Sequence, residues 1–191
     1  MTRGQALRTG IAMAIGIVGT AWSVMAEPSE KATVTMWVLN QANVSPEVLL
    51  RAQAETARIY NGAGVAVLWR NTGAPGCFIV NVVSNPLNGT GEITSDGVMG
   101  MAPGTGKAVG MHAWAFYASI QSFAALHGLD AGLLLGHVIA HEIGHLLLRN
   151  NSHSQAGVMR AGWDRLQVTR AAARALTFTS QEAALIRSRL Q

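Results

Sequence analysis

Alternating apolar and polar positions predict strands in the first two thirds of the chain. Residues 32–39 (ATVTMWVL) alternate and are rich in β-branched side chains, and similar apolar runs occupy residues 65–69 and 78–83. Residues 108–116 alternate again, and a shorter apolar piece at residues 98–101 lies among turn-forming residues. We expect these runs to be the strands of the fold.

Helical spacing of apolar positions, together with capping residues, predicts the helices. Ser45 followed by Pro46 opens the first helix, and Asp130 opens the most apolar one. Thr179 and Glu182 form a capping box that opens the last helix. The expected helices span residues 46–62, 117–126, 131–148, 164–176 and 180–190.

Residues 141–145 read His-Glu-Ile-Gly-His within the apolar helix. His141 and His145 lie four residues apart, so both imidazoles share one helix face and can bind the same metal ion. Glu142 lies beside them and can act as the general base for an attacking water molecule. These three polar side chains would be costly inside such a helix without partners, and a metal ion accounts for all of them. His137 is assigned to packing or to hydrogen bonding behind the metal ligands, because one straight helix cannot bring three ligands to one ion.

A catalytic zinc site usually has three protein ligands, so two histidines leave it incomplete. His153 is the nearest candidate, and a turn at residues 149–152 can bring it back to the helix, since Asn tolerates left-handed backbone angles. Asp164 and Glu182 stay open as alternative third ligands, because other zinc peptidases take a carboxylate from a later helix.

The segment resembles the metzincin zinc peptidases, whose pattern is HExxHxxGxxH followed by a Met-turn below the metal. The residues that carry the resemblance are His141, Glu142, His145, His153, Ser154 and Met159. The chain departs from the pattern at Leu148, which stands at the family glycine, and at Asn151, which stands at the usual third-ligand position. We interpret the later position of His153 as a redistribution of residues within the loop.

The resemblance implies an α+β fold of the zincin type: a single domain with a mixed twisted sheet, an active-site helix carrying HExxH, and C-terminal helices. It implies one catalytic Zn²⁺ held by three histidines, and Met159 as an apolar floor below them. It also implies that the strand before the active-site helix is a sheet edge that binds extended peptide. The sequence leaves open whether residues 98–101 or 108–116 form that edge.

Residues 1–26 are predicted to be a signal peptide, which leaves residues 27–191 as the catalytic domain. Arg3 and Arg8 form a basic start, an apolar run follows, and Val24 and Ala26 are small residues at the positions that a signal peptidase reads. We therefore expect an exported protein, periplasmic or extracellular, without stable membrane insertion after cleavage. An uncleaved N-terminal anchor is the alternative.

Composition excludes several other function classes. Cys77 is the single cysteine, so no intramolecular disulfide can form. The formal net charge of +4 includes Arg3 and Arg8 of the predicted signal peptide, and aromatic residues do not interleave with the basic ones, so we expect no nucleic-acid partner. The sequence thus predicts an exported zinc-dependent endopeptidase acting on peptides or proteins. The alternative is a non-catalytic binding protein with a metzincin-like fold and a structural zinc, which would have no need of Glu142.

Overall fold

Five of the apolar runs form one mixed sheet in the computed structural model, which describes residues 1, 31–85, 97–103, 110–149 and 153–191. The strands are β1 (Thr33–Asn40), β2 (Ala66–Arg70), β3 (Phe78–Val83), β4 (Gly100–Met101) and β5 (His112–Phe116). Their order is β2-β1-β3-β5-β4, with β4 antiparallel to β5 and the other pairs parallel. Among the described strands, β4 therefore forms one edge of the sheet and β5 lies inside it, so of residues 98–101 and 108–116 the former contain the edge strand.

The helices follow the capping residues that the sequence shows. They are α1 (Pro46–Gly62), α2 (Tyr117–His127), α3 (Ala131–Leu148), α4 (Arg165–Ala172) and α5 (Ser180–Leu190). Side chains of Ser45, Asp130, Asp164 and Thr179 accept the N-cap hydrogen bonds. The prediction of a helix to residue 176 was wrong: α4 ends at Ala172, because Arg174 takes a left-handed backbone angle (φ +55°) and turns the chain away.

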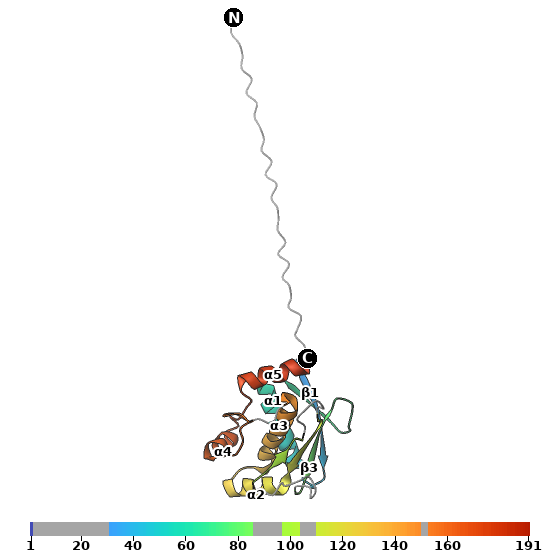
Figure 1. Cartoon of the computed structure of the whole chain (residues 1–191), viewed down its shortest axis with the longest axis vertical. Helices are drawn as coiled ribbons and strands as arrows, with labels where there is room; N and C mark the ends of the chain where they lie inside the picture. The colour runs from blue at the N-terminus through green and yellow to red at the C-terminus, as the bar shows by residue number, and fades with distance from the viewer. Residues whose placement is uncertain (2–30, 86–96, 104–109, 150–152) are drawn as a thin grey trace. The chain divides into compact units, whose positions relative to one another are not determined.

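Residues 31–191 form one compact unit, an α+β domain in which the labelled helices gather on one side of the sheet (Figure 1). Alternate strand residues point to this side and are buried, among them Val34, Met36, Val80, Val82, Ala113 and Ala115. The predicted signal peptide, residues 1–26, lies outside the described residues apart from Met1 and stays a prediction.

Helix α3 packs directly against α1 because glycines remove the side chains between them. A β-carbon at Gly136 would lie 2.6 Å from the carbonyl oxygen of Ala52 on α1. The Thr56 hydroxyl donates to the Gly136 carbonyl at 3.0 Å, and the Tyr60 hydroxyl donates to the Ala140 carbonyl at 3.2 Å. Helix α3 is the one described helix long and apolar enough to cross a membrane, yet 83% of its apolar window is buried inside the domain. It is the central helix of the core.

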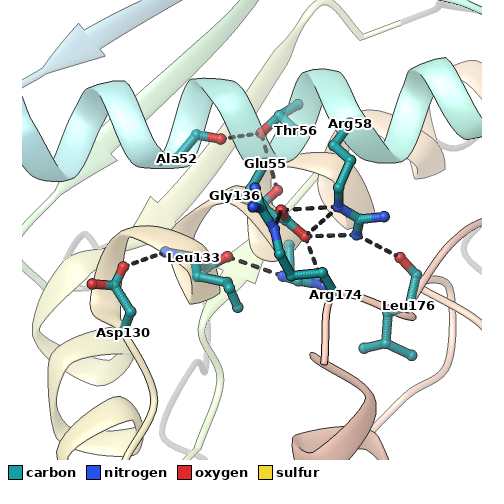
Figure 2. Close-up of polar contacts among 10 residues, drawn as sticks. Ala52, Glu55, Thr56, Arg58, Asp130, Leu133, Gly136, Arg174 and Leu176 are labelled. Carbon is teal, nitrogen blue, oxygen red and sulfur yellow. Dashed lines mark hydrogen bonds and ion pairs between the residues drawn. The ribbon is translucent and has the colours of Figure 1, made fainter. Parts of the chain in front are cut away.

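The buried carboxylate of Glu55 on α1 contacts the segment after α4 (Figure 2) and lies 3.5 Å from His137 Nε2 on α3. Glu55 is 1% exposed and accepts hydrogen bonds from Arg58 and Arg174, and Arg58 also donates to the Leu176 carbonyl. Burial favours the neutral acid, but the contacts with the two arginines hold the pKa of Glu55 below its usual value. Residues far apart in sequence are thereby fixed around the N-terminal half of α3.

Candidate metal centre

His141 and His145 lie on one face of α3, as their four-residue spacing predicts. Their Nε2 atoms are 3.0 Å apart. His141 Nδ1 donates a hydrogen bond to the Val158 carbonyl at 2.7 Å, which leaves the lone pair on Nε2. Burial lowers the pKa of His141 to about 4; the hydrogen bond to Val158 opposes this shift, and His145 and His153 add to it. The ring is therefore neutral, which is the form that binds metal.

His153 joins these two histidines from the loop after α3. Its ring lies 5.3 Å from that of His141 and 4.9 Å from that of His145, measured between ring centroids. The candidate ligand atoms of the three residues all lie within 4.8 Å of one another. The chain leaves the helix through Arg149, which adopts a left-handed angle (φ +54°), while the asparagines of the expected turn, residues 150 and 151, lie outside the described residues.

The donor chemistry of this cluster fits a zinc ion. Three imidazoles are a ligand set that zinc takes in catalytic sites, and such a set leaves a further coordination position for water or substrate. The Val158 carbonyl accepts a hydrogen bond from His141 Nδ1, the kind of contact that orients a histidine for metal binding. Among the residues that the structure describes, these three histidines are the one group able to hold a metal ion.

The two carboxylates considered as alternative third ligands have other partners. Asp164 accepts from the Gln167 amide at 2.9 Å and pairs with Arg160 at 2.8 Å, so it caps α4. Glu182 accepts from the Thr179 amide at 2.8 Å and from the Ser154 hydroxyl. Neither belongs to the metal-binding cluster found in the described part of the chain.

Glu142 lies against the edge strand. Its side chain is buried, with the residue 6% exposed, and a β-carbon at Gly100 on β4 would lie 2.6 Å from Glu142 Oε1. Burial raises the pKa of Glu142 to about 8. The Glu142 carboxylate thus lies against the backbone of β4 and lines the same cleft as the three histidines.

Met159 lies beneath α3. It is fully buried, and a β-carbon at Gly144 would lie 2.5 Å from Met159 Sδ, so the glycine next to His145 makes room for the sulfur atom. The loop that contains Met159 is closed by a hydrogen bond from the Ser154 amide to the Met159 carbonyl at 2.9 Å. Met159 therefore packs under the helix that carries the histidines and has no side-chain group able to take part in hydrolysis.

His137 lines the same cleft but does not belong to the histidine cluster, and its ring nitrogens have other neighbours. Its Nδ1 donates to the Leu133 carbonyl at 2.9 Å, its Nε2 lies 3.5 Å from Glu55 Oε1, and its ring meets Trp163 edge-on. These contacts agree with the assignment of His137 to packing and bonding behind the site.

A cleft of about 420 Å³ contains the histidine cluster and Glu142. The cleft is also lined by residues 97–102, which include β4, by residues 160–163, and by Phe123, His137 and Val138. Among the described lining residues, Arg160 carries the one permanent positive charge, and no tyrosine is present.

Sequence reasoning missed three parts of this site: the Val158 carbonyl, Gly100 and the contact between Ser154 and Glu182. A backbone carbonyl leaves no signal in the sequence. The glycine at residue 100 and the hydroxyl at residue 154 are visible, but their partners lie far away along the chain. The capping box at Thr179 was the one signal that placed Glu182 near a helix start.

Comparison with known proteins supports the fold. No protein-family model matches the chain, and no curated protein matches it. Among solved structures, a zinc-dependent peptidase from Methanocorpusculum labreanum is similar, with a TM-score of 0.54 and 14% sequence identity over 79% of this chain and 99% of that one. The chain shares the fold of that peptidase. At this identity, the likeness concerns the arrangement of helices and strands.

Proposed function

We propose that this protein is a zinc-dependent endopeptidase of the metzincin type that acts after export from the cytoplasm. One observation carries the proposal: the ligand atoms of His141, His145 and His153 gather within 4.8 Å, with buried Glu142 beside them. The similar fold of a zinc-dependent peptidase supports the same reading. A structural zinc site would have no use for a buried carboxylate held next to its ligands.

Each group of residues in the cleft has its own role in the proposed hydrolysis. When bound by the three histidines, one zinc ion would supply a Lewis acid for the scissile carbonyl and for the attacking water. Glu142 takes the proton from that water and returns it to the leaving amine nitrogen. In the metal-free protein burial raises the pKa of Glu142 to about 8, and a cation bound nearby would favour the carboxylate, which is the form that accepts the proton. Arg160, in the cleft wall, is the candidate for electrostatic stabilisation of the oxyanion.

The edge strand favours a polypeptide substrate bound in extended form. Strand β4 ends the sheet order, so within the described part of the chain no strand pairs with its outer side. An extended peptide can add to such an edge through backbone hydrogen bonds, which places its peptide bonds along the cleft that contains Glu142. Recognition through the backbone suits an endopeptidase, because it requires neither end of the substrate.

Export is supported by the sequence at the N-terminus. The basic start at Arg3 and Arg8 and the apolar run before Ala26 are typical of a cleaved signal peptide. The proposed partners are peptides or proteins met outside the cytoplasm. We propose neither a nucleic-acid partner nor stable membrane insertion.

The test compares the purified wild-type protein with Glu142→Gln in metal content and peptide hydrolysis. We expect one zinc per chain in both proteins, and hydrolysis by the wild type alone, reduced by at least about 100-fold in the variant because the general base is lost. A wild type without zinc would end the peptidase proposal. Zinc in both proteins with no hydrolysis of a broad peptide library would favour the non-catalytic binding protein.

A further inference from the structure

The third histidine of the cluster, His153, is held in a different way from the other two. His141 and His145 are held by the hydrogen-bonded backbone of α3, whereas His153 lies in the loop and is exposed. A loop side chain must be held near its binding geometry by its neighbours, or the metal has to order it at a cost in affinity. The residue next to His153 is Ser154, and both its backbone and its side chain are engaged.

The Ser154 side chain connects this loop to the last helix. Its hydroxyl donates to Glu182 Oε1, while Glu182 Oε2 accepts from the Thr179 amide at 2.8 Å. Glu182 is 7% exposed, so the contact with Ser154 is made by a buried carboxylate. Hydrogen bonds to charged groups are about twice as strong as those between neutral groups, so this contact is a firm one.

Backbone contacts hold the other end of the same loop. The Ser154 amide donates to the Met159 carbonyl, and the Val158 amide donates to the Thr177 carbonyl, each at 2.9 Å. The Val158 carbonyl in turn accepts from His141. Residues 154 to 159 therefore form a closed loop attached at Val158 to the segment before α5. The Ser154 hydroxyl is the attachment that lies directly beside His153.

We propose that Glu182 is a positioning residue for the metal centre: by holding the Ser154 hydroxyl from the start of α5, it keeps His153 in place as the third ligand. The inference rests on the proposed zinc site and deepens it. Glu182 supports the site without touching the metal: it binds the hydroxyl of Ser154, the residue that follows the proposed ligand His153. The capping box at the start of α5 then has two roles, one in helix capping and one in orienting the ligand loop.

The two roles of Glu182 can be separated by substitution. Ser154→Ala removes the contact with the loop and leaves the capping box intact. Thr179→Ala removes the N-cap hydrogen bond to the Glu182 amide and leaves the Ser154 hydroxyl in place. Ser154→Thr keeps a hydroxyl at residue 154. Loss of helix capping and loss of ligand positioning can thus be measured separately.

The experiment measures the zinc dissociation constant of each full-length variant by competition with a chromophoric chelator, beside its melting temperature. We expect Ser154→Ala to weaken zinc binding by about tenfold, which is the smaller end of the loss in affinity when a residue that supports a metal ligand is substituted. Ser154→Thr should bind zinc as the wild type does. Thr179→Ala is expected to lower the melting temperature without changing the dissociation constant. Equal zinc affinity in Ser154→Ala and wild type would overturn the inference while leaving the zinc site standing.

A second comparison asks whether the contact acts through His153. In a His153→Ala background, Ser154→Ala should change the zinc dissociation constant no further, because the ligand that it positions is already absent. A further tenfold loss in that background would show that Ser154 and Glu182 support the site by another route and would overturn the inference. A wild-type protein that binds no zinc would remove the inference together with the proposed function.

Discussion

Gly100 and Glu142 are in contact across the cleft: a β-carbon at residue 100 would lie 2.6 Å from Glu142 Oε1 and 2.8 Å from its Cγ. Gly100 belongs to the edge strand β4 and Glu142 to helix α3. Because Gly100 has no side chain, the carboxylate of Glu142, the proposed general base, can lie against the strand. Since Glu142 is no metal ligand in this arrangement, disturbance of this contact can be separated from disturbance of the metal.

The first prediction concerns this contact. Gly100→Val should displace the Glu142 carboxylate and lower kcat for peptide hydrolysis by about tenfold or more, because a misplaced catalytic group loses much of its effect. Zinc content should stay at the wild-type level. The matched control is Gly62→Ala at the end of α1, where the nearest atom to a new β-carbon lies at an ordinary 3.6 Å. Activity of Gly100→Val equal to that of the control would contradict the assigned position of Glu142.

The second prediction concerns the third ligand. His153→Ala should weaken zinc binding by more than about 100-fold, a larger loss than removal of a residue that only supports a ligand causes. Asp164→Asn should bind zinc as the wild type does, because Asp164 caps α4 and pairs with Arg160. Chelator competition on both variants provides the measurement. The reverse order of the two effects would transfer the ligand role to Asp164.

The third prediction concerns the stability of the metal-free protein between pH 6.5 and 8. The pKa of Glu142 is raised from 4.5 to about 8, so the unfolded chain binds fewer protons than the folded one in this range and stability should fall as pH rises. The pKa of His141 is lowered from 6.5 to about 4, so its contribution to stability is complete above pH 6.5. The expected change in stability between pH 6.5 and 8 therefore comes from Glu142.

Glu142→Gln should remove much of this slope. Thermal melts of wild type and variant in excess chelator, at pH 6.5 and pH 8, measure it. We expect the variant to be the more stable protein at pH 8, with a smaller difference at pH 6.5. Parallel pH profiles for the two proteins would show that the carboxylate is not held in an apolar environment.

The fourth prediction concerns the packing of α1 against α3. Alanine has a higher helix propensity than glycine by about 1 kcal/mol, so propensity alone would make Gly136→Ala stabilising. The structure predicts the opposite, because the new β-carbon would meet the Ala52 carbonyl at 2.6 Å and Glu55 Cβ at 2.7 Å. We expect a loss of about 1–3 kcal/mol in the free energy of unfolding, as for other overpacked cores. Urea denaturation measures it, and a gain in stability would show that the two helices can move apart freely.

The local elements of this protein could be read from its sequence. The bounds of α1, α3 and α5 follow capping residues and apolar spacing, which depend on neighbours within one or two helical turns. The placement of His141, Glu142 and His145 on one helix follows from the same periodicity. The end of α4 was placed too late, since the left-handed turn at Arg174 and its contact with Glu55 depend on a residue of α1.

What the sequence by itself determined is helix α3 with two histidines on one face and a glutamate beside them, because residues four apart on a helix must share a face. Tertiary structure decided which third histidine lies near them, which described strand forms the edge beside α3, and which partners Asp164 and Glu182 have. These outcomes depend on contacts such as Ser154 with Glu182 and Gly100 with Glu142, between residues 28 and 42 positions apart. Local spacing carries no information about such pairs, because packing of the whole chain brings them together.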